Sequence, residues 1–289
     1  MRWPRYKHIF FDCDSTLTAV EGIDALAASA GKGWRVSVLT QAAMDGDVDL
    51  GAIYEKRLKT VKPTRGQIDA LRHVYKKSVV EDAAEVVEIL QNNGQIVYII
   101  SGGLYEPVAQ FGLFLGIPTE RIQAVGIEYD ALSGTWWQSG DHLPNVSEQF
   151  RAVDEHPLTV TEGKIQIIKE LVGDQDGRSL LVGDGVSDLR AGIEVDLFIG
   201  YGGVISRKRV LSEAPAFIHS FSLGPVLALA MGPAALRSLA DKQGSGVAAK
   251  ALRLIEEEAI TFNNEKLRER FNSALSGPHS AVHSRPFGS

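Results

Sequence analysis

Short apolar runs recur along the chain, and each one stops abruptly at polar or glycine residues. The first run, residues 9–11, ends at Asp12, which is typical of a buried strand that delivers polar side chains at its carboxyl end. Runs of the same kind predict further strands at residues 96–100, 122–125, 179–182 and 197–199.

Amphipathic stretches lie between these runs. Over residues 79–92, 107–115 and 164–172, apolar positions recur every three or four residues, which is the spacing of one helix face. Strands that alternate with helices in this way indicate an α/β fold with a Rossmann-like parallel sheet core and helices on both faces. Ligands of such sheets bind at the carboxyl ends of the strands.

A mainly helical region interrupts this alternation. Residues 17–80 carry helical patterns at 22–30 and 48–61, and we interpret this region as a helical cap inserted into the core, where it would set substrate specificity. The catalytic core then consists of residues 1–16 and 81–230.

The segment after the strand at 122–125 gives a weaker pattern. Turn residues at 132–135 separate Ile127 from Trp136, and they predict a hairpin. We expect residues 138–160 to form an irregular loop.

Beyond residue 230 the chain continues past the predicted sheet. Residues 231–275 contain two helical patterns, one around Leu254 and one around Phe271, and they predict a C-terminal helical extension. The last stretch, 276–289, is rich in Ser, His, Pro and Gly, so we expect it to be disordered.

Composition narrows the class of protein. The chain has 289 residues, 44% hydrophobic and 23% charged, as in ordinary globular proteins. Its net charge of −6 repels anions, so we expect no nucleic-acid partner, and we expect any phosphate group to be held by local donors and a metal ion. The single cysteine, Cys13, cannot form an internal disulfide, which favours a reducing, cytoplasmic environment. The N-terminal apolar run is too short for a signal peptide or membrane helix, and we expect neither.

Polar clusters follow three of the predicted strands. Asp12 and Asp14 come after the first strand, Ser101 with Gly102 and Gly103 after the second, and Asp184 with Asp188 after the run at 179–182. Because the carboxyl ends of parallel strands meet at one edge, we expect these groups to converge. Carboxylates, a hydroxyl and backbone amides, joined by the cation of Lys164, are the groups that phosphoryl transfer requires.

Each group suits a definite task. Asp12 and Asp184 supply the hard oxygen ligands that Mg²⁺ prefers. Residues two apart on a strand point to the same face, so Asp12 and Asp14 can share a task, one attacking phosphorus and the other handling the proton of the leaving group. Ser101 and nearby amides would hold phosphate oxygens, and Lys164 would offset their charge.

These motifs, in this order, resemble those of the haloacid dehalogenase superfamily of hydrolases, over about residues 7–220. Within the superfamily, residues 12–17, 21–24 and 101–103 look like the corresponding motifs of phosphoserine phosphatases. The resemblance implies a Mg²⁺-dependent phosphomonoester hydrolase that acts through an aspartyl-phosphate and converts phosphoserine to serine. It also implies the following roles: Asp12 as nucleophile and metal ligand, Asp14 as acid/base with a metal-binding backbone carbonyl, Asp184 as metal ligand, Asp188 in support, and Ser101, Gly102 and Lys164 at the phosphate.

The same resemblance extends to the cap. It implies that Glu21 receives a substrate ammonium, that Arg57 pairs with a carboxylate, and that Met44 packs beside them. Two positions depart from the family pattern. Leu50 stands where some relatives carry an aromatic substrate contact, and Ser187, a further substrate-binding candidate, stands where some carry Asn or Thr.

Several alternatives stay open at this point. The same chemistry would serve another small phosphorylated metabolite or a phosphotransferase, and a non-catalytic binding module is a more distant possibility. Glu21 could merely complement a helix dipole, and Arg57 could be a solvated helix residue. A cysteine phosphatase is disfavoured because Ala19 stands where an arginine would cradle phosphate. The sequence implies neither a zinc site nor a nucleotide cofactor, and it leaves the oligomeric state open.

Overall fold

The computed structural model describes most of the chain. Met44, Trp136 and the tail after Ser276 lie outside the described residues, so the predictions made for them stay predictions. The described segments are residues 3–34, 36–38, 50–135, 145–173, 175–243 and 246–276.

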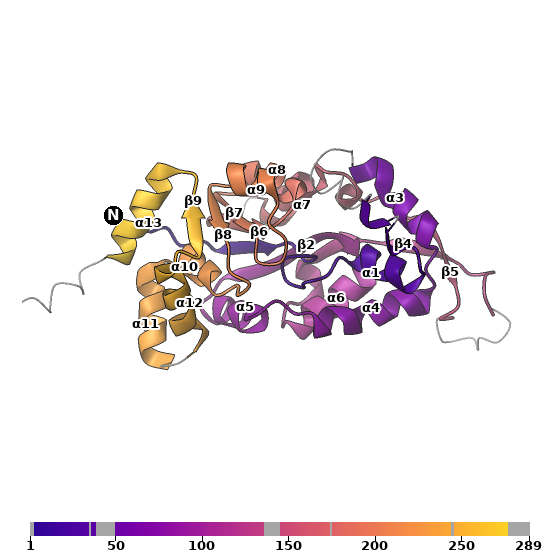
Figure 1. The fold of residues 1–289 in the computed structure, drawn as a ribbon, viewed down its shortest axis with the longest axis horizontal. Helices are drawn as coiled ribbons and strands as arrows, with labels where there is room; N and C mark the ends of the chain where they lie inside the picture. The colour runs from indigo at the N-terminus through magenta and orange to yellow at the C-terminus, as the bar shows by residue number, and fades with distance from the viewer. Residues whose placement is uncertain are drawn as a thin grey trace, which may run out of the picture.

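A seven-stranded sheet forms the centre of the molecule, in the order β3-β2-β1-β6-β7-β8-β9 (Figure 1). Neighbouring strands are parallel except β8 and β9, which are antiparallel. The predicted α/β fold with a mostly parallel sheet is therefore confirmed. The strands are β1 (His8–Phe11), β2 (Ile96–Leu104), β3 (Ile122–Val125), β6 (Ser179–Gly183), β7 (Leu197–Tyr201), β8 (Ala216–Ile218) and β9 (Ile260–Phe262).

Helices cover both faces of this sheet, and consecutive strand residues alternate between them. Phe11 packs into one buried cluster and Phe10 into the other, because neighbouring side chains of a strand point to opposite faces. In Figure 1 one helical layer lies above the sheet and the other below it. One layer contains α5 (Ala83–Asn92), α6 (Tyr105–Phe114) and α10 (Pro225–Met231), and the other contains α7 (Gly163–Val172), α8 (Val186–Ala191) and α9 (Lys208–Glu213).

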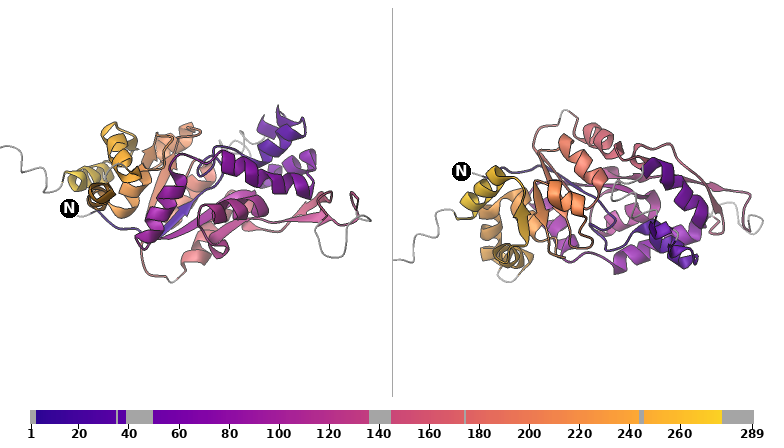
Figure 2. Two further views of the ribbon diagram at one scale, coloured as in Figure 1. Left: turned by 90° about the horizontal axis from the view of Figure 1, so that it is seen from below. Right: turned by 45° about the horizontal axis from the view of Figure 1, so that its top comes forward.

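The inserted helices lie at one end of the long axis of the molecule, as all views in Figures 1 and 2 show. They are α1 (Gly22–Ser29), α3 (Leu50–Val61) and α4 (Arg65–Lys77). The sequence pattern did not single out α4, although the helix begins at a capping box in which Thr64 and Gln67 exchange side-chain and backbone hydrogen bonds. We refer to α1, α3 and α4 as the cap below; the assignment of residues 17–80 as an inserted cap that sets substrate specificity stays a prediction.

A small antiparallel hairpin, β4 (Ile127–Asp130) and β5 (Gln149–Val153), lies at the same end. The prediction of an irregular loop over residues 138–160 is therefore wrong for β5, and also for the 3₁₀ turn at Pro157–Thr159. Within β5 only Phe150 is buried, so the strand lacks the strict alternation that would reveal it.

The C-terminal elements lie at the opposite end of the molecule (Figure 1). The two predicted helical patterns form α12 (Val247–Glu256) and α13 (Glu265–Leu275), whereas α11 (Pro233–Gln243) and β9 were not predicted. The extension is part of the core, because β9 pairs with β8 and the Phe271 ring lies 5.2 Å from that of Trp3. Among the described helices, none is long and apolar enough to cross a membrane.

Candidate active site

The carboxyl ends of three neighbouring strands bring the predicted polar groups together. Asp12 follows β1, Asp184 follows β6, and Ser101 lies within β2, which continues to Leu104. The predicted end of that strand at residue 100 is therefore too early. The pairing of β2 with β3 shifts its register between Ile100 and Leu104, an irregularity that is common next to active sites.

Lys164 enters from the first turn of α7 and joins two carboxylates. Its Nζ lies 2.9 Å from Asp12 Oδ1 and 2.6 Å from Asp188 Oδ1, and all three side chains are buried. Burial opposes the charged ammonium, but the two carboxylates outweigh this effect and raise the pKa of Lys164 above its ordinary value. Gly183 makes room for this cluster, since a Cβ there would lie 2.2 Å from Asp188 Cγ.

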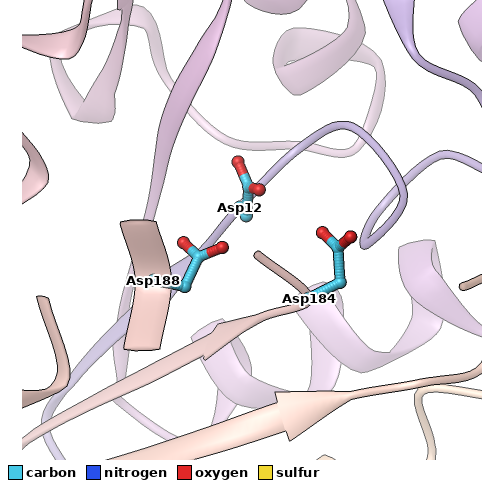
Figure 3. Close-up of side chains that lie close together, drawn as sticks. All are labelled: Asp12, Asp184 and Asp188. Carbon is cyan, nitrogen blue, oxygen red and sulfur yellow. The ribbon is translucent and has the colours of Figure 1, made fainter. Parts of the chain in front are cut away.

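Three of the carboxylates could hold a metal ion. Asp12, Asp184 and Asp188 each offer an oxygen within 4.8 Å of the others, and Figure 3 shows their side chains close together. Buried oxygen ligands of this kind fit Mg²⁺. Asp188, predicted in support, stands in this side-chain group, whereas the Asp14 side chain does not, which leaves only its backbone carbonyl for the predicted metal role.

Burial close to other carboxylates shifts the pKa values of this group. Burial raises the pKa of Asp184 to about 7, against the lowering effect of Arg207, whose Nε lies 2.9 Å from Asp184 Oδ2. Burial likewise raises the pKa of Asp188 to about 7. A cation in this group would therefore relieve an electrostatic cost.

Asp14 lines a pocket that Asp12 and Lys164 also line. Its Oδ2 accepts a hydrogen bond of 2.8 Å from the Gly22 amide at the start of α1. Burial raises the pKa of Asp14 to about 7 despite the amide of Gly22, so this carboxyl can both donate and accept a proton near neutral pH. Tyr75 lies close by: a Cβ on Gly22 would lie 2.2 Å from the Tyr75 hydroxyl oxygen.

Ser101 also lines the pocket, in the Ser-Gly-Gly segment of β2. Its buried Oγ accepts a hydrogen bond of 2.9 Å from the Gly103 amide. The carbonyl of Gly102 accepts a hydrogen bond of 2.7 Å from the hydroxyl of Tyr54, which comes from α3 in the cap.

The cap supplies an acidic and a basic side chain to the pocket. Glu21 precedes α1, and its Oε1 accepts a 2.7 Å hydrogen bond from Ser15 and lies 3.6 Å from Arg207. Arg57 is buried on α3, with its guanidinium carbon 5.5 Å from the centre of the Tyr54 ring. Eight of the predicted residues line this pocket: Asp12, Asp14, Glu21, Arg57, Ser101, Gly102, Lys164 and Ser187. The other lining residues, which were not predicted, are Ile23, Asp24, Tyr54, Gly103, Leu158 and Val160.

Sequence reasoning did not select six of the lining residues, namely Ile23, Asp24, Tyr54, Gly103, Leu158 and Val160. It also missed Tyr75, which lies beside Gly22, and Arg207, which pairs with Asp184. Arg207 follows the glycine-rich stretch after β7, so the rule that strand ends converge could have drawn attention to it. Tyr54 precedes Arg57 by one helical turn and shares its face. For Tyr75, helical spacing alone marks a core residue, and no further signal was available.

The Cys13 side chain does not line this pocket. It lies in the hydrophobic cluster on the opposite face of β1 from Lys164, and burial raises its pKa well above the ordinary thiol value. A thiolate nucleophile is thus disfavoured, in agreement with the absence of an arginine at Ala19.

Comparisons of the sequence and of the structure with known proteins agree with one another. A family model described as haloacid dehalogenase-like hydrolase matches residues 6–196. The phosphoserine phosphatases of Bos taurus and Homo sapiens are each 30% identical to the chain over 215 residues, covering 74% of it and 89% of each relative. A phosphoserine phosphohydrolase-like protein from Francisella tularensis superimposes with a TM-score of 0.63 at 26% identity, covering 74% of this chain and 95% of that protein.

Proposed function

This chain belongs to the haloacid dehalogenase-like hydrolases and is a phosphatase, and from that premise we propose that it hydrolyses phosphoserine through a covalent phosphoryl intermediate on Asp12. The observation that carries the proposal is one pocket lined by Asp12, Asp14 and Ser101 in the core and by Glu21 and Arg57 in the cap.

Asp12 is the nucleophile in this proposal. Its Oδ1 accepts hydrogen bonds from the Cys13 amide at 2.8 Å and from Lys164 at 2.9 Å. These donors fix the carboxylate, which leaves Oδ2 to attack phosphorus. Lys164 also offsets the charge that builds up on the phosphoryl oxygens, while Ser101 and the amides beside Gly102 bind those oxygens.

Asp14 acts on the leaving group and on water. With a pKa raised to about 7 by burial, it donates its proton to the alkoxide of serine as the bond to phosphorus breaks. The resulting carboxylate then takes a proton from the water that attacks the phosphoryl-enzyme. Two moderate barriers replace one high barrier.

A divalent cation, most suitably Mg²⁺, completes the site. Asp12, Asp184 and the backbone carbonyl of Asp14 would hold it, with Asp188 beside them. When bound, Mg²⁺ stabilises the negative charge that develops on the transferring group.

Two opposite charges in the cap support an amino-acid substrate. Glu21 would receive the ammonium of phosphoserine and Arg57 its carboxylate, with Ser187 close to the bound substrate. The ammonium would share Glu21 with Arg207, which lies 3.6 Å away. The relatives at 30% identity, named as phosphoserine phosphatases, support the same substrate.

Phosphate release from a panel of small phosphate esters, with and without Mg²⁺, tests this function. We expect Mg²⁺-dependent turnover in which phosphoserine has the highest kcat/KM. If another ester is clearly preferred, the substrate assignment is wrong, whereas transfer of the phosphoryl group to an added alcohol in place of water would identify a phosphotransferase. Absence of turnover on every ester would contradict catalysis itself.

A further inference from the structure

A chain of hydrogen bonds joins the cap to Ser101. The Tyr54 hydroxyl on α3 donates to the Gly102 carbonyl at 2.7 Å. That carbonyl and the Gly103 N–H belong to the same peptide unit, and the N–H donates to Ser101 Oγ at 2.9 Å. A single peptide group therefore connects a cap side chain with the hydroxyl that is proposed to bind phosphate.

Both ends of this series of hydrogen bonds are shielded from water. Tyr54 is 2% exposed and Ser101 is fully buried. In such surroundings hydrogen bonds strengthen and polarise one another, so a donor to the Gly102 carbonyl makes the Gly103 N–H a better donor to Ser101. Burial also raises the pKa of the Tyr54 hydroxyl, which therefore keeps its proton and remains a donor.

The effect on Ser101 is one of orientation. A serine hydroxyl has two acceptor lone pairs and one donor hydrogen. When the Gly103 N–H occupies a lone pair, the hydroxyl hydrogen is directed elsewhere, and Ser101 lines the pocket together with Asp12. Its O–H can then donate to a phosphate oxygen.

We propose that Tyr54 is a positioning residue that couples the cap to phosphate binding by fixing the Gly102–Gly103 peptide and, through it, the Ser101 hydroxyl. The proposal rests on the proposed function, because it assumes that Ser101 meets the phosphate. The proposal gives different roles to two residues that lie one turn apart on α3. Arg57 acts on the part of the substrate beyond the phosphate, while Tyr54 acts on the phosphate that all substrates share.

A double-mutant cycle tests this coupling without any turnover. The affinity for inorganic phosphate, with Mg²⁺ present, is measured calorimetrically for the wild type, Tyr54→Phe, Ser101→Ala and the double variant. Tyr54→Phe keeps the ring and removes only the hydroxyl. Thermal unfolding of each variant checks its fold. Lys56→Met, at an exposed position of the same helix, is the control.

We expect Tyr54→Phe to weaken phosphate binding about threefold to tenfold in the wild-type background, and by less than about 1.5-fold when Ser101 is already alanine. Equal weakening in both backgrounds would show that Tyr54 acts without Ser101, and the proposal would be wrong. It would also be wrong if Tyr54→Phe had no effect, or if the wild type bound no phosphate. Coupled phosphate binding in a protein that hydrolyses no ester would instead contradict the proposed function and leave the coupling standing.

Discussion

Replacing Arg57 with methionine should remove the preference for substrates that carry a carboxylate. Methionine keeps an unbranched side chain against the Tyr54 ring but deletes the guanidinium. Because the phosphate is handled by Ser101 and Lys164 in the core, the chemical step itself should be retained on substrates that never meet Arg57.

The magnitude follows from the burial of this arginine. Arg57 is 4% exposed, so its contact with a substrate carboxylate would form largely away from water. A hydrogen bond to a charged group contributes roughly 1.5 to 3 kcal/mol. If Arg57→Met removes this free energy from the transition state, kcat/KM for phosphoserine should decrease by about tenfold to 150-fold.

The assay compares substrates that differ by a single group. Phosphoserine carries both charges, phosphoethanolamine lacks the carboxylate, and 3-phosphonooxypropanoate lacks the ammonium. Arg57→Met should lower kcat/KM for phosphoserine and 3-phosphonooxypropanoate but leave phosphoethanolamine within about twofold, and Glu21→Gln should give the reciprocal pattern. Lys56→Met removes a positive charge from the neighbouring, exposed position of α3 and serves as the matched control.

Equal losses on phosphoserine and phosphoethanolamine would refute this reasoning. They would place Arg57 at the phosphate or in the structure of the cap, and the substrate assignment would fall while the phosphatase assignment stood.

Three further predictions follow from the site and the core. EDTA should abolish turnover and Mg²⁺ should restore it; restoration by Zn²⁺ alone would argue against an oxygen-ligand site. Burial raises the pKa of Asp14, Asp184 and Asp188 to about 7 in the folded protein, from about 4 in the unfolded chain. Without metal, protonation of these carboxyl groups therefore stabilises the folded state. That stabilisation is lost as pH rises from about 4 to about 7, so Mg²⁺ should raise the Tm more at pH 8 than at pH 5, and an equal increase would contradict the account. Phe271→Ala should cost about 3 to 5 kcal/mol of unfolding free energy in urea titrations, since this 2%-exposed ring packs on Trp3 and Phe262; a loss below about 1 kcal/mol would mean that α13 is only loosely attached.

The sequence predicts the strands that carry the candidate site residues, because the pattern of each strand lies within a few consecutive residues. An apolar run that stops at Asp12, or at Asp184, marks a buried strand and its polar end at once, and the parallel sheet then brings these ends together. By contrast, β9 has three residues, of which only Ile260 is buried, so it is too short to show a period. Its place in the sheet comes from pairing with β8, a long-range contact.

Contacts between distant segments explain what else was missed at the site. The hydroxyl of Tyr54 and the carbonyl of Gly102 are 48 positions apart, and Arg207 is 23 positions from Asp184. Helical spacing can assign Tyr54 to a face of α3, but only the docking of that helix on β2 decides which group the hydroxyl meets. Patterns along a chain carry no information on such docking.

The central claim, a phosphoryl group carried by Asp12, can be tested by trapping it. The enzyme is mixed with phosphoserine and Mg²⁺, quenched in acid within milliseconds, digested and mapped by mass spectrometry. We expect a phosphorylated peptide that contains Asp12, is cleaved by hydroxylamine as an acyl phosphate, and is absent from Asp12→Asn, which should also lose at least a hundredfold in turnover, roughly the minimum expected for loss of a nucleophile. Phosphate found on any other side chain, or an Asp12→Asn variant that keeps most of its turnover, would contradict the account.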